Sequence, residues 1–222
     1  MFGNTTIDGV FDISSSEANF AVEFNSTFSG NTIINGIFTV LSSKDAHGVS
    51  FFSTASGDIT INGTFTVSAD GNSLARGVEF SFTVSGGVTI NGIFTVSSPN
   101  EAFGVDFHAA SSYDVISSKV TINGIFTISC SDDDADAYGV RFLSDISGDI
   151  TINGVFTISS SGAAADAYGV HFNSIADSTQ TINGIFTISS SANAYGVYFD
   201  STVSGELLGI PKFYSNKVDS GD

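Results

Sequence analysis

The sequence is poor in several residue types, and each shortage excludes a class of protein. It has one cysteine, Cys130, which excludes an internal disulfide framework. Lys and Arg together number 6 against 23 acidic residues, and the resulting net charge of −17 argues against binding to nucleic acid or to an anionic membrane surface. No apolar run approaches the roughly 18 residues needed to cross a membrane, so we expect no membrane insertion.

The strongly negative net charge suits a secreted or surface-exposed protein. Apolar residues, unlike basic ones, are plentiful. Hydrophobic residues make up 41% of the chain, which is ample for a core. The expected location is extracellular or at the cell surface. No signal peptide is visible before the repeats, so we expect either export by another signal or a mature or partial product.

The dominant feature that is present is a repeated phrase, T-I-N-G-I-F-T-I. Its anchor position recurs at spacings of 27, 27, 29, 32, 30 and 30 residues, and periods of this length are typical of solenoids. Each copy is followed by a second phrase, aromatic-G-V-x-F. The anchor position of the first phrase is occupied by Asp8, Asn35, Asn62, Asn91, Asn123, Asn153 and Asn183.

The length of the repeat varies mainly at one place, after F-T-I-S, with one extra insertion at residues 111–115. Stacked coils need this arrangement, because their strands must stay in register whereas their loops need not. The only two prolines, Pro99 and Pro211, lie in the variable corner and beyond the last repeat, where neither removes a ladder hydrogen bond.

Within each repeat, residues alternate with period two, which indicates strands rather than helices. In the second phrase, Tyr138, Val140 and Phe142 share one parity and are expected to face the core, whereas Gly139 and Arg141 take the other parity. A solvent-facing column of variable residues is therefore predicted. It consists of Glu23, Ser50, Glu79, Asp106, Arg141, His171 and Tyr198.

These patterns predict an all-β fold, a single-stranded parallel β-solenoid of about seven coils with 27–32 residues per coil. Equivalent residues would stack about 4.8 Å apart, so that 14 of the 21 phenylalanines form two core ladders. The Asn column would form an amide ladder at a bend. We expect the solenoid to span residues 1–205, followed by a divergent C-terminal segment, 206–222, that acts as a cap or linking tail.

One competing fold remains open at this stage. Asn-Gly between two apolar runs is the strongest short hairpin signal, so each repeated phrase could instead be a tight hairpin in an antiparallel meander.

The ladders, the Asn column and the fixed coil with one variable corner resemble those of parallel β-helix proteins. Repetitive bacterial surface proteins and autotransporter passengers are the nearest class. The resemblance implies a right-handed coil and a role as an adhesin, fibre or scaffold, with a surface polysaccharide or host ligand as a candidate partner. It is architectural and transfers no site residues.

Among residues that could carry chemistry, the strongest candidates are Glu79, Asp106 and Arg141 in the variable column. Stacking would bring the two carboxylates to about 5 Å, the separation found in retaining glycosidases. The alternative is an exposed charge cluster without a function. The three histidines lie in different coils and columns, so neither a zinc site nor a nucleophilic triad is expected.

A second candidate is the acidic corner loop with Asp132, Asp133, Asp134 and Asp136, whose oxygens could accept calcium. The loop lacks a recurring ligand period, so a solvated acidic loop is the alternative. No other cofactor is expected.

Three outward columns of the first phrase can be interpreted in more than one way. Threonine columns on either side of the Asn column form a regular, weakly polar face of the kind that ice-binding solenoids use, although threonine is also simply a good outward strand residue. A further column has outward parity and yet is mostly aliphatic, so it either turns inward at the bend or forms an exposed stripe for contact with another chain. It comprises Val10, Ile37, Ile93, Ile125, Val155 and Ile185, with Thr64 in the third coil.

Taken together, the sequence favours a non-enzymatic extracellular structural protein, a fibre subunit or adhesin stalk. Terminal coils expose unpaired strand edges, so we expect a homo-oligomer or filament formed by end-to-end stacking. The alternative is a carbohydrate-active or carbohydrate-binding β-helix that uses the Glu79 and Asp106 column.

Overall fold

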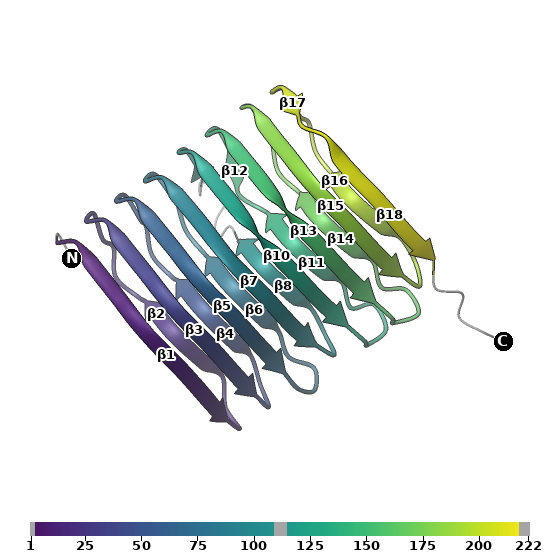
Figure 1. The fold of residues 1–222 in the computed structure, drawn as a ribbon, viewed down its shortest axis with the longest axis horizontal. Coiled ribbons are helices and arrows are strands. Elements are labelled where there is room, and N and C mark those ends of the chain that lie inside the picture. The colour runs from purple at the N-terminus through teal and green to yellow at the C-terminus, as the bar shows by residue number, and fades with distance from the viewer. Residues whose placement is uncertain (1–2, 109–114, 218–222) are drawn as a thin grey trace.

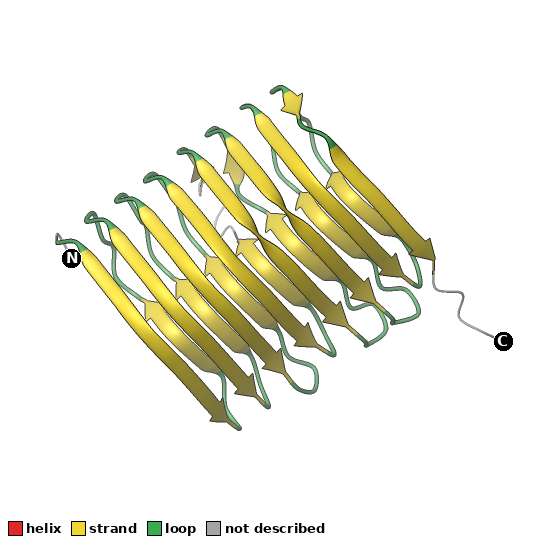
Figure 2. Cartoon of the chain, in the orientation of Figure 1, coloured by secondary structure: helices red, strands yellow, loops and turns green. Residues whose placement is uncertain are grey.

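The computed structural model describes residues 3–108 and 115–217, and every regular element within them is a β-strand (Figure 2). The first two residues, residues 111–114 of the expected insertion and the last five residues of the expected tail lie outside the described part. Each coil contributes one long strand to a large sheet and one short strand to a small sheet (Figure 1).

The large sheet consists of the repeated phrase T-I-N-G-I-F-T-I and its flanks, in strands of 11 residues. In spatial order these are β1 (Thr5–Ser15), β3 (Thr32–Ser42), β5 (Ile59–Ala69), β7 (Val88–Ser98), β10 (Val120–Cys130), β13 (Ile150–Ser160) and β15 (Gln180–Ser190), followed by β17 (Leu207–Leu208) and β18 (Pro211–Lys217), which both pair with β15.

The small sheet consists of the aromatic-G-V-x-F phrases, in strands of 6 residues. Its members are β2 (Asn19–Phe24), β4 (Ala46–Phe51), β6 (Ala75–Phe80), β8 (Ala102–Phe107), β11 (Ala137–Phe142), β14 (Ala167–Phe172) and β16 (Ala194–Phe199).

Every strand pairing among the described residues is parallel and keeps equivalent repeat positions in register. In the pairing of β10 with β13, for example, Asn123 lies beside Asn153 and Phe126 beside Phe156. The expected parallel solenoid is therefore confirmed and the hairpin meander is excluded. Asn-Gly does not turn the chain. It lies in the middle of a continuous strand, so the predicted bend is absent.

The phenylalanine columns form the predicted core ladders. Along the large sheet, from Phe38 to Phe186, successive rings stack at centroid distances of 4.6–4.8 Å with interplanar angles of 1–10°. A second ladder runs from Phe24 to Phe199 along the small sheet. Burial of each ring stabilises the fold by roughly 1.5–3 kcal/mol before chain entropy is subtracted.

A third, much shorter ladder closes each coil between the small sheet and the next long strand. It includes β9 (Val115–Ile116) and β12 (Asp145–Ile146), which pair with each other, and isolated bridges elsewhere. We did not predict this ladder, although an apolar residue four positions after the last Phe of most short strands marks it. Its members are Phe28, Ala55, Val84, Ile116, Ile146, Ala176 and Val203.

The short strands do not alternate as expected, and this corrects the predicted parity. Gly139 and Val140 both face the core, since a Cβ on Gly139 would lie 2.8 Å from the Phe156 ring and Val140 belongs to the core cluster. This kink places Tyr138, predicted to be inward, on the outer face together with Arg141, at 5.0 Å between ring centroid and guanidinium. Glycine is needed here because the opposing Phe156 ring occupies the space of a side chain.

Residues 207–217 continue the large sheet rather than leaving it. Phe213 pairs with Phe186, and the two rings lie 5.4 Å apart at an angle of 35°. The divergent segment thus adds one further, less regular layer at the C-terminal end of the described stack (Figure 1).

Candidate functional site

The outer face of the small sheet holds the variable column, which we predicted to face solvent. The prediction holds for Glu23 in the first coil, which is exposed, but it is wrong for the second to sixth coils, where the column is buried. The residues Glu79, Asp106 and Arg141 are 4%, 0% and 9% exposed. The prediction was wrong because the kink places two columns side by side on this face, the variable column and the aromatic one, and their large side chains cover each other. Phe103 in the aromatic column is itself fully buried.

Asp106 is the centre of an ion network that links three coils. The Arg141 guanidinium donates to both of its carboxylate oxygens at 2.9 Å, and Arg76 Nε donates to Oδ2 at 3.0 Å. A bidentate guanidinium–carboxylate pair is among the stronger hydrogen-bonded pairs in proteins. Both oxygens of this carboxylate are therefore engaged.

Glu79 forms the other half of the network. Its Oε2 lies 3.0 Å from His47 Nδ1, and its Oε1 accepts from the Ser81 hydroxyl at 3.0 Å and lies 3.7 Å from Arg76 Nε. The Ser50 hydroxyl also donates to Oε2, at 3.3 Å.

The charges of this network stabilise the ionised carboxylates. Burial alone would raise the pKa of Glu79, but the hydrogen bond from His47 and the charge of Arg76 hold that pKa below its usual value. Burial would likewise raise the pKa of Asp106, but Arg141 and Arg76 hold it below the usual value. Two carboxylates and two guanidiniums thus balance each other in a buried site.

The aromatic column continues this face toward the C-terminus. The guanidinium of Arg141 lies 4.0 Å from the Phe103 ring centroid, and the rings of Tyr138 and Tyr168 stack at 5.0 Å. The His171 ring lies 4.6 Å from that of Tyr168, and neither of its nitrogens has a hydrogen-bond partner. Burial, with a further contribution from Arg141, lowers the pKa of His171 to about 4, so this histidine is neutral at pH 7.

This geometry is poorly suited to glycoside cleavage. A general acid must hold a proton at working pH, and the pKa of each carboxylate is lowered rather than raised. The side chains of Glu79 and Asp106 are 5% and 0% exposed, which leaves no room for a sugar to approach. The network is built to hold coils together.

The acidic corner loop does not gather its carboxylates around one point. The Asp133 Oδ1 accepts from the Ala163 amide, and Asp136 accepts from the Asp166 amide and from the Tyr138 hydroxyl, all at 2.8–2.9 Å. Among residues 3–108 and 115–217, no group of three or more His, Cys, Asp or Glu side chains could hold a metal ion. The expected calcium ligands Asp132 and Asp134 are exposed beside them.

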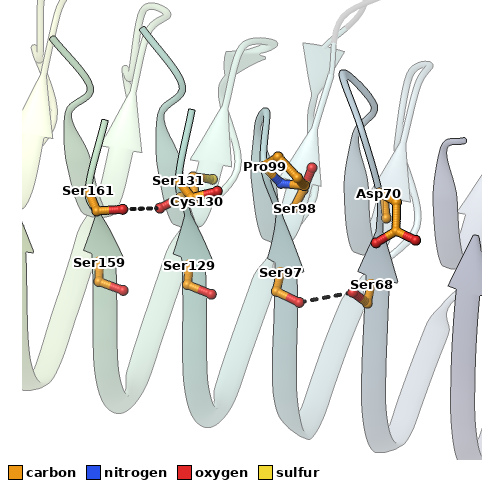
Figure 3. Close-up of a pocket in the computed structure, with 11 residues that line it drawn as sticks. Ser68, Asp70, Ser97, Ser98, Pro99, Ser129, Cys130, Ser131, Ser159 and Ser161 are labelled. Atoms are coloured by element: carbon orange, nitrogen blue, oxygen red, sulfur yellow. Dashed lines mark hydrogen bonds between the residues drawn. The ribbon is translucent and has the colours of Figure 1, made fainter. Parts of the chain in front are cut away.

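A shallow groove of about 410 Å³ runs along the corner where the long strands end (Figure 3). Serines line most of it, among them Ser68 and Ser97, whose hydroxyls are hydrogen-bonded at 3.1 Å. Cys130 also lines it, but burial raises the pKa of this thiol, so it is a poor nucleophile. None of the three histidines borders the groove to act as a base.

The outer face of the large sheet carries the predicted amide ladder. Each Asn Nδ2 donates to the Oδ1 of the preceding coil at 2.8–3.0 Å, from Asn183 back to Asn35, which donates in turn to Asp8 Oδ1 at 2.6 Å. At the other end, the Ile210 amide donates to Asn183 Oδ1 at 3.2 Å. The ladder runs along straight strands rather than at a bend. Its members are Asn35, Asn62, Asn91, Asn123, Asn153 and Asn183.

The ambiguous aliphatic column also lies on this outer face, and the structure settles its orientation as exposed. Exposure ranges from 40% to 73%, and alternation continues through Asn-Gly without turning the column inward. We call this column the aliphatic stripe. It consists of Val10, Ile37, Ile93, Ile125, Val155 and Ile185.

Comparison with known proteins adds no relative. No protein-family model, curated protein or solved structure matches this chain. Within the described part of the chain, no helix has the length and hydrophobicity that crossing a membrane requires.

Proposed function

We propose that this protein is a non-catalytic structural solenoid of the cell exterior, a fibre subunit or adhesin stalk, whose coil stacks join end to end. The observation that carries the proposal is the apolar surface at the C-terminal end of the described stack. It combines a hollow of about 420 Å³ between the last long strand and residues 207–213 with a set of exposed apolar side chains. They are Leu207, Leu208, Ile210, Phe213 and Tyr214, which are 44–79% exposed.

The opposite end of the stack fits this surface in chemistry. The first coil presents the edge of β1, where Ile7, Phe11 and Ile13 are only partly buried. In a joined pair, Phe11 of one copy would extend the ring ladder beyond Phe213 of the other. Equivalent strands would continue at about 4.8 Å per coil. A head-to-tail contact of this type propagates as an open filament.

Charge supports the same pairing. The first coil carries Asp8, Asp12, Glu17 and Glu23, whereas the layer at the other end exposes one acid, Glu206, and one base, Lys212. Two first coils would repel each other, so charge favours head-to-tail encounter over encounter between two first coils.

Two acidic substitutions at the C-terminal end test the proposal. We expect the parent protein to form filaments in negative-stain images and to scatter light increasingly with concentration. The pair Leu207→Glu and Phe213→Glu should abolish both, because it opposes new negative charge to the acidic first coil. Ile175→Glu, at a residue 47% exposed on the side of the stack, is the matched control. A protein that stays monomeric at high concentration contradicts the proposal.

The alternative, a carbohydrate-active or carbohydrate-binding protein that uses Glu79 and Asp106, has a separate test. We expect the parent protein to cleave none of the acidic and neutral polysaccharides in an activity screen, so that Glu79→Gln and Asp106→Asn have no activity to abolish. Cleavage by the parent protein that either substitution abolishes would replace the structural proposal.

A further inference from the structure

The outer face of the large sheet is unusually flat. Neighbouring strands in most sheets are rotated by roughly 20–25° relative to each other. Here the successive core rings below this face, from Phe38 to Phe186, deviate by only 1–10°. Coils that stack with so little rotation keep each column straight, so the face is a regular plane (Figure 1).

This plane is uncharged over most of its length, although the chain as a whole carries 23 acidic residues. From β3 to β15, its outward columns contain only Thr, Asn, Ser and aliphatic residues. Charges occur only at the two ends, with Asp8 and Asp12 in β1 and Lys212 in β18. The aliphatic stripe runs between the Asn column and a Thr column.

We propose that this face binds the same face of a second copy of the chain, with the two solenoids antiparallel and their strands running in the same direction. A two-fold axis parallel to the strands, placed between β7 and β10, generates this arrangement. It lays the aliphatic stripe of one copy on that of the other, with Ile93 facing Ile125 of the second copy.

The end charges select this orientation. With β1 of one copy opposite β18 of the other, Lys212 faces Val10 and lies between Asp8 and Asp12, which flank Val10 on the same face. The parallel orientation would instead place the acidic pairs of both copies together, and like charges across an interface oppose binding.

The size of the face is sufficient for a stable dimer. The outward columns extend over about nine residues of each strand, at a rise of about 3.3 Å per residue, and the eight strands lie about 4.8 Å apart. The plane therefore has an area of about 1,000 Å² on each copy. A specific protein interface of standard size buries about 800 Å² on each partner. Water released from the stripe supplies the driving force, and the second N–H of each Asn side chain, which the ladder does not use, can donate across the contact.

This contact is distinct from end-to-end stacking, because it involves the side of the solenoid and leaves both ends free. The test therefore uses the background with both Leu207→Glu and Phe213→Glu, in which end contacts are blocked. Sedimentation equilibrium at physiological ionic strength should show a dimer. Adding Ile93→Lys and Ile125→Lys places four lysines at the centre of the interface and should raise the dissociation constant at least about 100-fold. Ile175→Lys should leave the dimer unchanged.

Cysteine cross-linking tests the orientation. A mixture of Ile93→Cys and Ile125→Cys proteins should form a disulfide-linked heterodimer under mild oxidation, whereas each protein alone should cross-link much less. The native Cys130 is buried and its thiol pKa is raised, so it does not compete. Preferential cross-linking of each protein with itself indicates the parallel orientation and contradicts the proposal.

Two other outcomes also overturn the inference. A dimer that the central lysines leave intact uses another surface. Alternatively, the protein could remain monomeric and change the shape of growing ice crystals. If Ile93→Lys and Ile125→Lys abolish that change, the face binds ordered water rather than a second copy.

Discussion

The two outer faces of this solenoid are made by the same repeats but follow different rules. On the large sheet, most columns repeat one residue or a close relative in nearly every coil, and the stripe is exposed. On the small sheet, the variable column changes from coil to coil and is buried in the second to sixth coils, with Asp106 held by guanidiniums of both adjacent coils. Further identical coils could extend the columns of the large sheet, whereas the residues of the variable column each need particular partners in the adjacent coils.

The difference matters for folding. The phenylalanine ladders and the amide ladder would still form if one coil were looped out and its neighbours paired with each other, since their residues are nearly interchangeable. Such a slip would separate Asp106 from Arg76 or Arg141. The buried network therefore penalises coil slippage that the repetitive columns tolerate, a use of buried polar groups for specificity.

The largest effect on stability is expected at the centre of the buried ion network on the small sheet. Asp106→Leu leaves Arg76 and Arg141 buried without their shared carboxylate and should lower the free energy of unfolding by about 3–5 kcal/mol. Urea denaturation followed by circular dichroism measures it. Thr95→Leu, on the outer face of the large sheet beside the same coil's core, is the control and should stay within about 0.5 kcal/mol. Equal losses would erase the proposed contrast between the faces.

A smaller loss is expected within the repetitive face. Asn123→Ala removes the hydrogen bonds to Asn91 and Asn153 and should cost about 1–2 kcal/mol, because each net hydrogen bond contributes about 0.5–1.5 kcal/mol. The same urea titration serves as the measurement. Ser129→Ala, in the same strand, controls for loss of a polar outward side chain. A cost no larger than that of the control would show that the ladder adds nothing.

The buried face should also respond to acid. The unfolded chain protonates His171 near pH 6.5, but the folded chain does so only near pH 4. Burial of the ring, which stacks on Tyr138 and Tyr168, is the main reason that its pKa is lowered; Arg141 lowers it further, and Asp200 opposes this. The unfolded state thus binds more protons in this window, and stability should fall as the pH is lowered from about 6.5 to about 4.

Thermal melting across this range checks the expectation, with His171→Phe as the variant that should flatten the slope. Below about pH 4.5 both proteins should lose stability further, because the lowered pKa values of Glu79 and Asp106 mean that the unfolded carboxylates are protonated first. If the melting temperature of His171→Phe falls with pH as steeply as that of the parent protein between about pH 6.5 and 4, groups other than His171 cause the loss of stability there.

The smallest effect concerns the aliphatic stripe. Ile125→Thr introduces the residue that coil three already has at Thr64, at a position 48% exposed, and should change the unfolding free energy of the monomer by less than about 0.5 kcal/mol. Urea titration at low protein concentration, in the background with Leu207→Glu and Phe213→Glu, measures the monomer. A loss comparable to that from Asn123→Ala would show that the stripe serves the fold rather than a contact.

The sequence was a good guide wherever repetition was strict. The parallel pairing, the ladders of Phe126 and Asn123 and the variable corner all follow from alternation and spacing. The short strands were misread because alternation assumes a uniform pleat, and Gly139 breaks it. The burial of Asp106 could not be read from its own coil, since its partners belong to the coils before and after it. One signal was present: each acidic residue of this column has an Arg or His within one coil.

The amide ladder has an electrical direction. Every Asn carboxamide donates toward the N-terminal end of the stack, so the local dipoles add head to tail over six coils, with their positive ends toward β1. At that end the column has Asp8 in place of Asn, and its negative charge accepts the last N–H. An acidic residue at the first turn of a helix satisfies a macrodipole in the same way. The column thus acts as a polarised rod with its own counter-charge, and the two ends of the flat face are electrostatically distinct.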